Sequence, residues 1–212
     1  ALCLALLGSV FHSSAVHAAF DISERRIYYY AHERSASVTI TNSGDEEREY
    51  VINTHGWDDR TKELAPKLIA YPPVFQLQPG DQQKVRLLLR NRSGFEAPLF
   101  FRFVIREVVM DEAEQPNGLN IPISMSFPLY YVDKSVKPEA RFERVAAPEG
   151  HRILVTNTSN TLVEVRSVTS ADGQKAKLLK HLLPGRQEIF EFLHWSPPFE
   201  FHIRNGDRVS VD

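Results

Sequence analysis

Histidines are common metal ligands and acid–base catalysts, and in this sequence they are scattered. The eight histidines are His12, His17, His32, His55, His151, His181, His194 and His202. No His-x-x-x-His pair and no cysteine pair accompanies them, so the ligand spacing of a zinc site is missing. We therefore predict that the chain binds no metal and no cofactor.

The sequence also lacks the motifs of nucleophilic catalysis and of phosphate binding. It contains no Gly-x-Ser-x-Gly elbow and no glycine-rich phosphate loop. The acidic pairs Asp58-Asp59 and Asp111-Glu112 stand in polar, loop-like segments, where we interpret them as solvated turn residues rather than as an acid–base pair. We predict that the chain is not an enzyme.

Two tryptophans, Trp57 and Trp195, leave a binding function open, because an indole ring can line a sugar site. A single tryptophan in each half of a chain is more often a packing residue. Carbohydrate binding through Trp57 or Trp195 is therefore kept as an alternative function.

The charge balance argues against nucleic acid as a partner. The 25 Lys and Arg residues are matched by 27 Asp and Glu residues, which gives a net charge of -2. Without a general basic field, the chain has no strong attraction for phosphate backbones or anionic lipids. We predict no nucleic-acid binding.

The first 18 residues have the pattern of a leader. They contain no Lys, Arg, Asp or Glu and start with the apolar run Ala1 to Leu7, which is typical of the hydrophobic region of a signal peptide. The run is too short for a bilayer span, which needs about 20 residues. We predict a signal peptide over residues 1–18, with cleavage after Ala18 or Ala19, a secreted product without membrane insertion, and a mature chain that lacks the only cysteine, Cys3.

Short β-branched and aromatic runs separated by Asn, Gly, Pro and Asp clusters predict an all-β sandwich protein. The polar segment Asp133 to Pro138 interrupts the runs and is typical of a linker. We predict two β domains, 19–133 and 140–212, joined by residues 134–139. The segment Val38 to Asn42 resembles Ile153 to Asn157, which hints at two related sandwiches. The predicted strands of the first domain are Arg26 to Tyr30, Ala36 to Thr41, Glu49 to Thr54, Lys84 to Leu89, Leu99 to Val108 and Leu119 to Val132.

The segment before the linker alternates strictly between apolar and small or polar residues. Its apolar members are Leu119, Ile121, Ile123, Met125, Phe127 and Leu129. In a strand they would line one face, as in any strand that faces a core. Pro122 and Pro128 cannot donate ladder hydrogen bonds, however, which favours a strand at the edge of a sheet, and a long apolar edge needs a partner.

Several segments together resemble the periplasmic chaperones of the chaperone/usher pathway, the PapD-like family. They are Arg26-Ile27-Tyr28, Val38 to Asn42, Pro72 to Gly80 followed by Val85-Arg86-Leu87, Phe101 to Glu107, and Phe127 to Tyr131. The resemblance implies two immunoglobulin-like domains in a boomerang. It also implies a periplasmic protein that stabilises incomplete pilus or fimbrial subunits by lending them its Leu119–Leu129 strand, and then delivers them to an outer-membrane usher.

The resemblance further implies an anchor for the carboxylate at the subunit's C-terminus. Arg26 matches an arginine on the first strand of classical members, whereas Pro128 stands where those members have a lysine. The Ser126-Phe127-Pro128-Leu129 segment is more similar to the archaic branch, in which an arginine corresponding to Arg102 takes the carboxylate. Both Arg26 and Arg102 are therefore candidate anchors, and a solvated strand arginine is the alternative for each.

Two further possibilities stay open. The chain could itself be a structural pilus or coat subunit, although such subunits typically carry a disulfide and lack a strand. The free chaperone could also hide its apolar strand by self-association.

Overall fold

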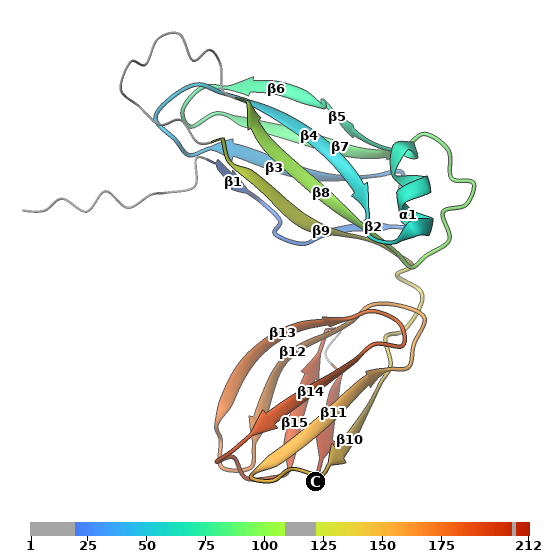
Figure 1. Cartoon of the computed structure of the whole chain (residues 1–212), viewed down its shortest axis with the longest axis vertical. Helices are drawn as coiled ribbons and strands as arrows, with labels where there is room; N and C mark the ends of the chain where they lie inside the picture. Colours follow the sequence, from blue (N-terminus) through green and yellow to red (C-terminus); the bar gives the residue numbers. More distant parts are fainter. Residues whose placement is uncertain (1–19, 109–121, 205–206) are drawn as a thin grey trace, which may run out of the picture.

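The chain folds into two β-sandwiches set at an angle to each other (Figure 1). The structure is a computed structural model that describes residues 20–108, 122–204 and 207–212. The predicted all-β class and the angled pair of sandwiches are confirmed. The strand ends do not by themselves define folding units, so the domain limits 19–133 and 140–212 stay a prediction.

The first sandwich packs a four-stranded sheet against a five-stranded sheet. The four-stranded sheet has the order β1-β3-β7-β5, with bounds Phe20–Ile22, Ser35–Asn42, Gln82–Leu89 and Leu68–Tyr71. The five-stranded sheet has the order β2-β9-β8-β4-β6, with bounds Ile27–Tyr30, Ser124–Val132, Leu99–Val108, Arg48–Gly56 and Val74–Leu77. Alternate side chains of each strand point between the sheets, which is why Phe101, Phe103 and Ile105 of β8 are fully buried.

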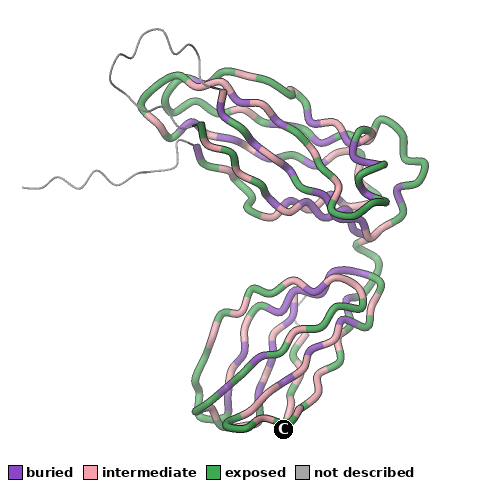
Figure 2. Tube along the Cα trace, viewed as in Figure 1, coloured by how far each residue is buried: buried purple, intermediate pink, exposed green. Residues whose placement is uncertain are grey.

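The second sandwich is built from one three-stranded and one four-stranded sheet. The three-stranded sheet has the order β10-β11-β14, with bounds Ala140–Val145, His151–Asn157 and Gln187–Phe192. The four-stranded sheet has the order β13-β12-β15-β16, with bounds Lys175–Leu182, Val163–Ser170, Phe199–Ile203 and Arg208–Val211. Each sandwich has its own hydrophobic core, so buried residues run along the middle of both (Figure 2).

One short helix, α1 (Asp59–Leu64), follows β4 and continues into a 3-10 turn, Ala65–Lys67. Asp58 caps it, because its carboxylate accepts the Thr61 N–H at 2.8 Å. The sequence interpretation of Asp58-Asp59 as turn residues therefore missed a helix start. In the part of the chain that the structure describes, no helix is long and apolar enough to cross a membrane.

The predicted strands of the first sandwich agree with the structure to within a few residues, and Leu99 to Val108 agrees at both ends. The short strands β1, β5 and β6 were not predicted, because each is too brief to show a period of two. Residues 119–121 of the predicted strand from Leu119 to Val132 lie outside the described residues. Pro122 and Ile123 are described but precede the strand, because β9 begins at Ser124.

Candidate functional site

Strand β9 has a neighbour along its whole length on one side only. Its register with β8 runs from Ser124 opposite Arg106 to Tyr131 opposite Leu99. On the other side, the parallel strand β2 pairs only with Leu129 to Val132. In the described part of the chain, no strand lies against Ser124 to Pro128 on that side.

The hydrogen-bond pattern shows which backbone groups face this open edge. Glu107 donates its N–H to the carbonyl of Ile123 at 2.9 Å, so Ile123 belongs to a hydrogen-bonded pair with β8. Such pairs alternate along an antiparallel ladder, and therefore Ser124, Ser126 and Pro128 direct their backbone groups away from β8. Pro128 thus costs the β8 ladder no hydrogen bond, which explains how β9 tolerates it.

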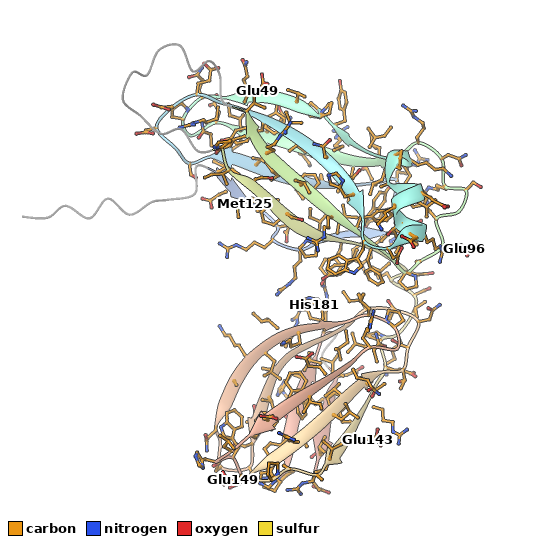
Figure 3. The ribbon with its side chains drawn as sticks, viewed as in Figure 1. Glu49, Glu96, Met125, Glu143, Glu149 and His181 are labelled. Atoms are coloured by element: carbon orange, nitrogen blue, oxygen red, sulfur yellow. The ribbon has the colours of Figure 1, made fainter. Side chains whose placement is uncertain are left out.

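The apolar row of β9 faces the core of its own sandwich and is buried to different depths. Leu129 is completely buried and Phe127 is 7% exposed, whereas Ile123 and Met125 are only partly buried against the same core (Figure 3 labels Met125). Leu119 and Ile121 lie outside the described residues. Within the described row, the side chains with surface still to cover are therefore Ile123 and Met125.

The start of β9 is fastened by a residue that the sequence analysis did not single out. Glu107 is 3% exposed and accepts the N–H of Ile123 on its carboxylate at 3.3 Å. Burial raises the pKa of Tyr50 to about 12, and the negative charge of Glu107 makes the second largest contribution to this increase. The alternation of Leu99 to Val108 places Glu107 on the core face, and this signal could have identified it.

Arg102 stands on the outer face of β8, between two neighbouring strands. The register places it opposite Pro128 of β9 and opposite His55 of β4. Its guanidinium carbon lies 4.4 Å from the centroid of the Trp57 ring, over which it is positioned. Among the described residues, Arg102 has no ion-pair partner, so its charge is available for a ligand.

Arg26 lies on the other side of the same proline. It precedes β2, whose first residue, Ile27, is paired with Leu129, so Arg26 comes next to Pro128. Adjacent strands are about 4.8 Å apart, which puts the backbones of Arg26 and Arg102 about 10 Å apart across β9. The structure therefore brings together two arginines that are 76 positions apart in the sequence.

Arg26 is also close to the joint between the sandwiches. Burial raises the pKa of Tyr130, and the positive charge of Arg26 acts in the opposite direction. Burial, followed by the same charge, lowers the pKa of His181 on the second sandwich. The His181 ring stacks on Tyr130 with centroids 5.7 Å apart, on the side of the second sandwich that faces the first (Figure 3).

A buried carboxylate of the second sandwich completes the joint. Glu164 is 6% exposed and accepts the Tyr28 hydroxyl of the first sandwich at 3.0 Å. Arg204 donates to the same carboxylate at 3.1 Å, and its guanidinium carbon lies 3.9 Å from the centroid of the Tyr28 ring. These contacts hold the two sandwiches in one relative orientation beside the arginine pair.

The residues considered for other chemistry are placed differently. Trp57 is 51% exposed and carries Arg102, and Trp195 packs on Phe192 with ring centroids 5.2 Å apart. Across the described ranges, no group of His, Cys, Asp and Glu side chains is arranged to hold a metal ion. The arrangement beside β9 consists of an open strand edge and the two cations Arg26 and Arg102. These features suit the binding of a polypeptide strand and its carboxylate.

Comparison with known proteins shows the family of the chain. The family model described as "Pili and flagellar-assembly chaperone, PapD N-terminal domain" matches residues 19–137. The chain belongs to this family. Pilus-assembly chaperones are not enzymes, so the predictions of a PapD-like chaperone and of a non-enzymatic protein are confirmed.

Solved structures of pilus chaperones share the fold of the whole chain. The match to the YadV chaperone has 18% identity and a TM-score of 0.63, and covers 92% of this chain and 98% of that chain. The match to a structure of the Salmonella enterica SafA pilin in complex with the SafB chaperone has 16% identity and a TM-score of 0.64, with 92% and 95% covered.

A third match is to the CsuC–CsuE chaperone–tip adhesion subunit complex from archaic Csu pili of Acinetobacter baumannii, with 14% identity and a TM-score of 0.58, covering 92% of this chain and 97% of that chain. At such identities the likeness shows the fold alone. A search of curated proteins found no match.

Proposed function

We propose that this chaperone acts in the periplasm, where it stabilises an incomplete pilus subunit by lending it strand β9 and then delivers the subunit to an outer-membrane usher. The observation that carries the proposal is the open edge of Ser124 to Pro128, beside which Ile123 and Met125 are only partly covered. A subunit strand added at this edge would gain ladder hydrogen bonds worth about 0.5–1.5 kcal/mol each.

The half-open side chains would supply the register of the added strand. Covering an exposed large apolar side chain contributes roughly 1.5–3 kcal/mol when it becomes fully buried, and Ile123 and Met125 can each supply part of this. Phe127 and Leu129 are already committed to the chaperone's own core, so in this proposal they hold β9 in place. Leu119 and Ile121 would extend the row of inserted side chains.

Arg102 and Arg26 are the proposed anchors for the subunit's terminal carboxylate. They flank Pro128 at the end of the open edge, so a carboxylate bound there would fix where the added strand stops. A hydrogen bond between charged groups contributes about 1.5–3 kcal/mol. Because Arg102 is exposed and has no ion-pair partner within residues 20–108, 122–204 and 207–212, we assign it the larger share.

The test uses the edge and spares the core. Ser126→Pro removes a backbone N–H that faces the open edge and leaves the β8 ladder intact, and Ser126→Ala is the matched control because it changes only the side chain. The chaperone is co-expressed with pilus subunits encoded near its gene, and the subunit recovered in a periplasmic pull-down is quantified. We expect Ser126→Pro to lower recovery about ten-fold, from the lost hydrogen bond and the bulk of the ring, with no effect of Ser126→Ala. Recovery with Ser126→Pro equal to wild type would overturn the edge as the binding site.

A further inference from the structure

The proposed function leaves one feature of this site unexplained: an exposed tryptophan lies beneath Arg102, an arginine without an ion-pair partner among the described residues. Half of Trp57 is in contact with water, although burying an aromatic ring is favourable. Its ring carries the Arg102 guanidinium at 4.4 Å, within the range of a cation–π contact. Arg102 lies on β8, and Trp57 lies beside that strand just past the end of β4, where it donates its N–H to the Phe100 carbonyl.

The backbone under Trp57 is fixed from several directions. Its N–H is shared between the Phe100 carbonyl at 3.2 Å and the Thr61 hydroxyl at 2.8 Å. Asp58, the next residue, caps α1 and accepts the Thr61 N–H. Thr61 itself is 1% exposed, so this turn is part of the folded interior.

Gly56 lets the helix pack directly on the strand end. A Cβ atom at Gly56 would lie 2.0 Å from the backbone nitrogen of Lys62, which no side chain could tolerate. The close approach of α1 to β4 therefore depends on a glycine at this position. Together with the Asp58 cap, it makes the backbone of Trp57 a rigid support for the ring.

A rigid ring has a specific effect on a flexible arginine. The arginine side chain has many rotamers, and much of this conformational freedom is lost when its guanidinium binds a carboxylate. A guanidinium held over an aromatic face has already lost part of that freedom. Its N–H groups lie in its own plane, so contact with the ring leaves them free for a bidentate carboxylate.

We infer that Trp57 is a positioning residue for Arg102, which it holds as a preoriented cation for the terminal carboxylate of the subunit. The inference rests on the proposed function. It gives the exposed indole a role that is neither core packing nor sugar binding. In this role, α1 fixes the backbone of Trp57, and the Trp57 ring orients Arg102.

The first experiment measures capture of the subunit identified in the pull-down described above. Trp57→Leu keeps an apolar side chain without an aromatic face, and Trp57→Phe keeps the face. We expect Trp57→Leu to lower capture about five-fold, Trp57→Phe to stay within two-fold of wild type, and Arg102→Ala to lower capture at least ten-fold. The double variant should be no weaker than Arg102→Ala, because the ring acts only through the arginine.

A control subunit separates anchoring from general binding. The same subunit, extended by two glycines at its C-terminus, has its carboxylate displaced, and we expect the wild type and all four variants to capture it equally. Wild-type capture of the native subunit by Trp57→Leu would overturn the role of Trp57, and so would a double variant clearly weaker than Arg102→Ala. If Ser126→Pro and Arg102→Ala still reduce capture in those cases, the proposed function stands and only this inference fails.

A spectroscopic readout tests the contact without any subunit. In a Trp195→Phe background, Trp57 is the only tryptophan of the chain. Replacing Arg102 by Ala in this background uncovers the ring, and we expect a red shift of its fluorescence, while the far-UV circular dichroism stays the same. An emission spectrum that does not change would overturn the contact on which the inference is built.

Discussion

In both sandwiches a buried asparagine stands at the end of a corresponding strand. Asn42 ends β3 and Asn157 ends β11, and both are buried, with 0% and 1% exposed. The Asn42 amide donates to the carbonyls of Glu46 and Leu77 at 2.8 and 2.9 Å. The Asn157 amide donates to the corresponding carbonyls of Thr161 and Leu182, both at 2.7 Å. This shared set of asparagine hydrogen bonds shows that the two halves are variations of one architecture.

The sandwiches differ in how they treat their outer strands. In the first, β9 is regular, and Ser124 and Ser126 direct their backbone groups toward an edge where none of the described strands lies. In the second, the edge strand β13 carries lysines at 175, 177 and 180, and its register with β12 shifts beside Leu179. Edge lysines and bulges are ordinary protections against unwanted strand pairing. The difference teaches that an open edge is a local property of β9 rather than a consequence of the fold.

Replacing the buried asparagines is the strongest test of the similarity between the two sandwiches. Asn42→Ala or Asn157→Ala leaves two carbonyls without their amide donor. Both carbonyls are buried at Asn157, whereas at Asn42 the Leu77 carbonyl is buried and the Glu46 carbonyl is part-buried. Each buried carbonyl that loses its donor costs about 1–3 kcal/mol. We expect each variant to lose about 3 kcal/mol of unfolding free energy, measured by urea denaturation followed by circular dichroism. Asn53→Ala, at an exposed position of β4, is the control and should change stability very little. A loss below 1 kcal/mol at either asparagine would contradict the equivalence of the two sites.

The sequence could predict the likeness of the halves better than the features that distinguish them. The match of Val38–Asn42 with Ile153–Asn157 pointed to related sandwiches, because an apolar strand followed by Asn is a local pattern. Each asparagine amide has one partner 4 positions away and a second partner that is 35 positions away for Asn42 and 25 for Asn157. Only folding brings the distant partner to the amide. The bulge in β13 also depends on the register with β12, which has no local signature.

The candidate site was predictable to a similar extent. The alternation and the prolines of Leu119–Leu129 predicted an edge strand, and the family resemblance supplied Arg26 and Arg102. The position of both arginines beside Pro128 required the pairing of three strands. Trp57 was interpreted as a packing residue, because a sequence does not show which side chain lies across from a strand end.

The joint between the sandwiches gives a second test. The first sandwich contributes aromatic rings to this joint, and the second sandwich contributes charged side chains. Burial alone would raise the pKa of Glu164, but the Tyr28 hydroxyl and the charges of His181, Arg204 and Arg166 together hold it below its ordinary value of 4.5. A carboxyl whose pKa is lowered by folding stabilises the native state above its unfolded pKa, and this contribution is lost as the pH falls through the folded pKa. His181 adds to the loss, because burial and Arg26 lower its pKa from 6.5, so that protonation below that pH favours unfolding.

Tyr28→Phe should therefore destabilise the protein most at neutral pH and progressively less in acid. At pH 7 the variant loses a hydrogen bond to a charged acceptor, and we expect it to be less stable than wild type by about 1.5 kcal/mol. As the pH falls below 4.5 we expect the difference to shrink, because Glu164 takes up a proton in the wild type when the pH passes through its lowered pKa. Tyr30→Phe is the matched control, since its ring stacks on Tyr28 with centroids 6.3 Å apart. Thermal unfolding at pH 7 and at a series of lower pH values measures the effect, and a gap that does not narrow as the pH falls through the acid range would contradict the assignment.

The smallest expected effect concerns the bulge that distinguishes β13 from β9. Leu179 has a φ of +49°, in the left-handed region that favours glycine, and its side chain is 47% exposed. Leu179→Gly removes the backbone strain and gives up little buried surface, so we expect a gain of about 0.5–1 kcal/mol in urea denaturation. Leu178→Gly is the matched control: Leu178 is partly buried against the second core and lies outside the left-handed region, so its loss should destabilise the domain. A destabilised Leu179→Gly variant would mean that the exposed leucine contributes more through its contacts than it costs through strain. The shift in register would then be a packing feature of β13 and not a protected edge.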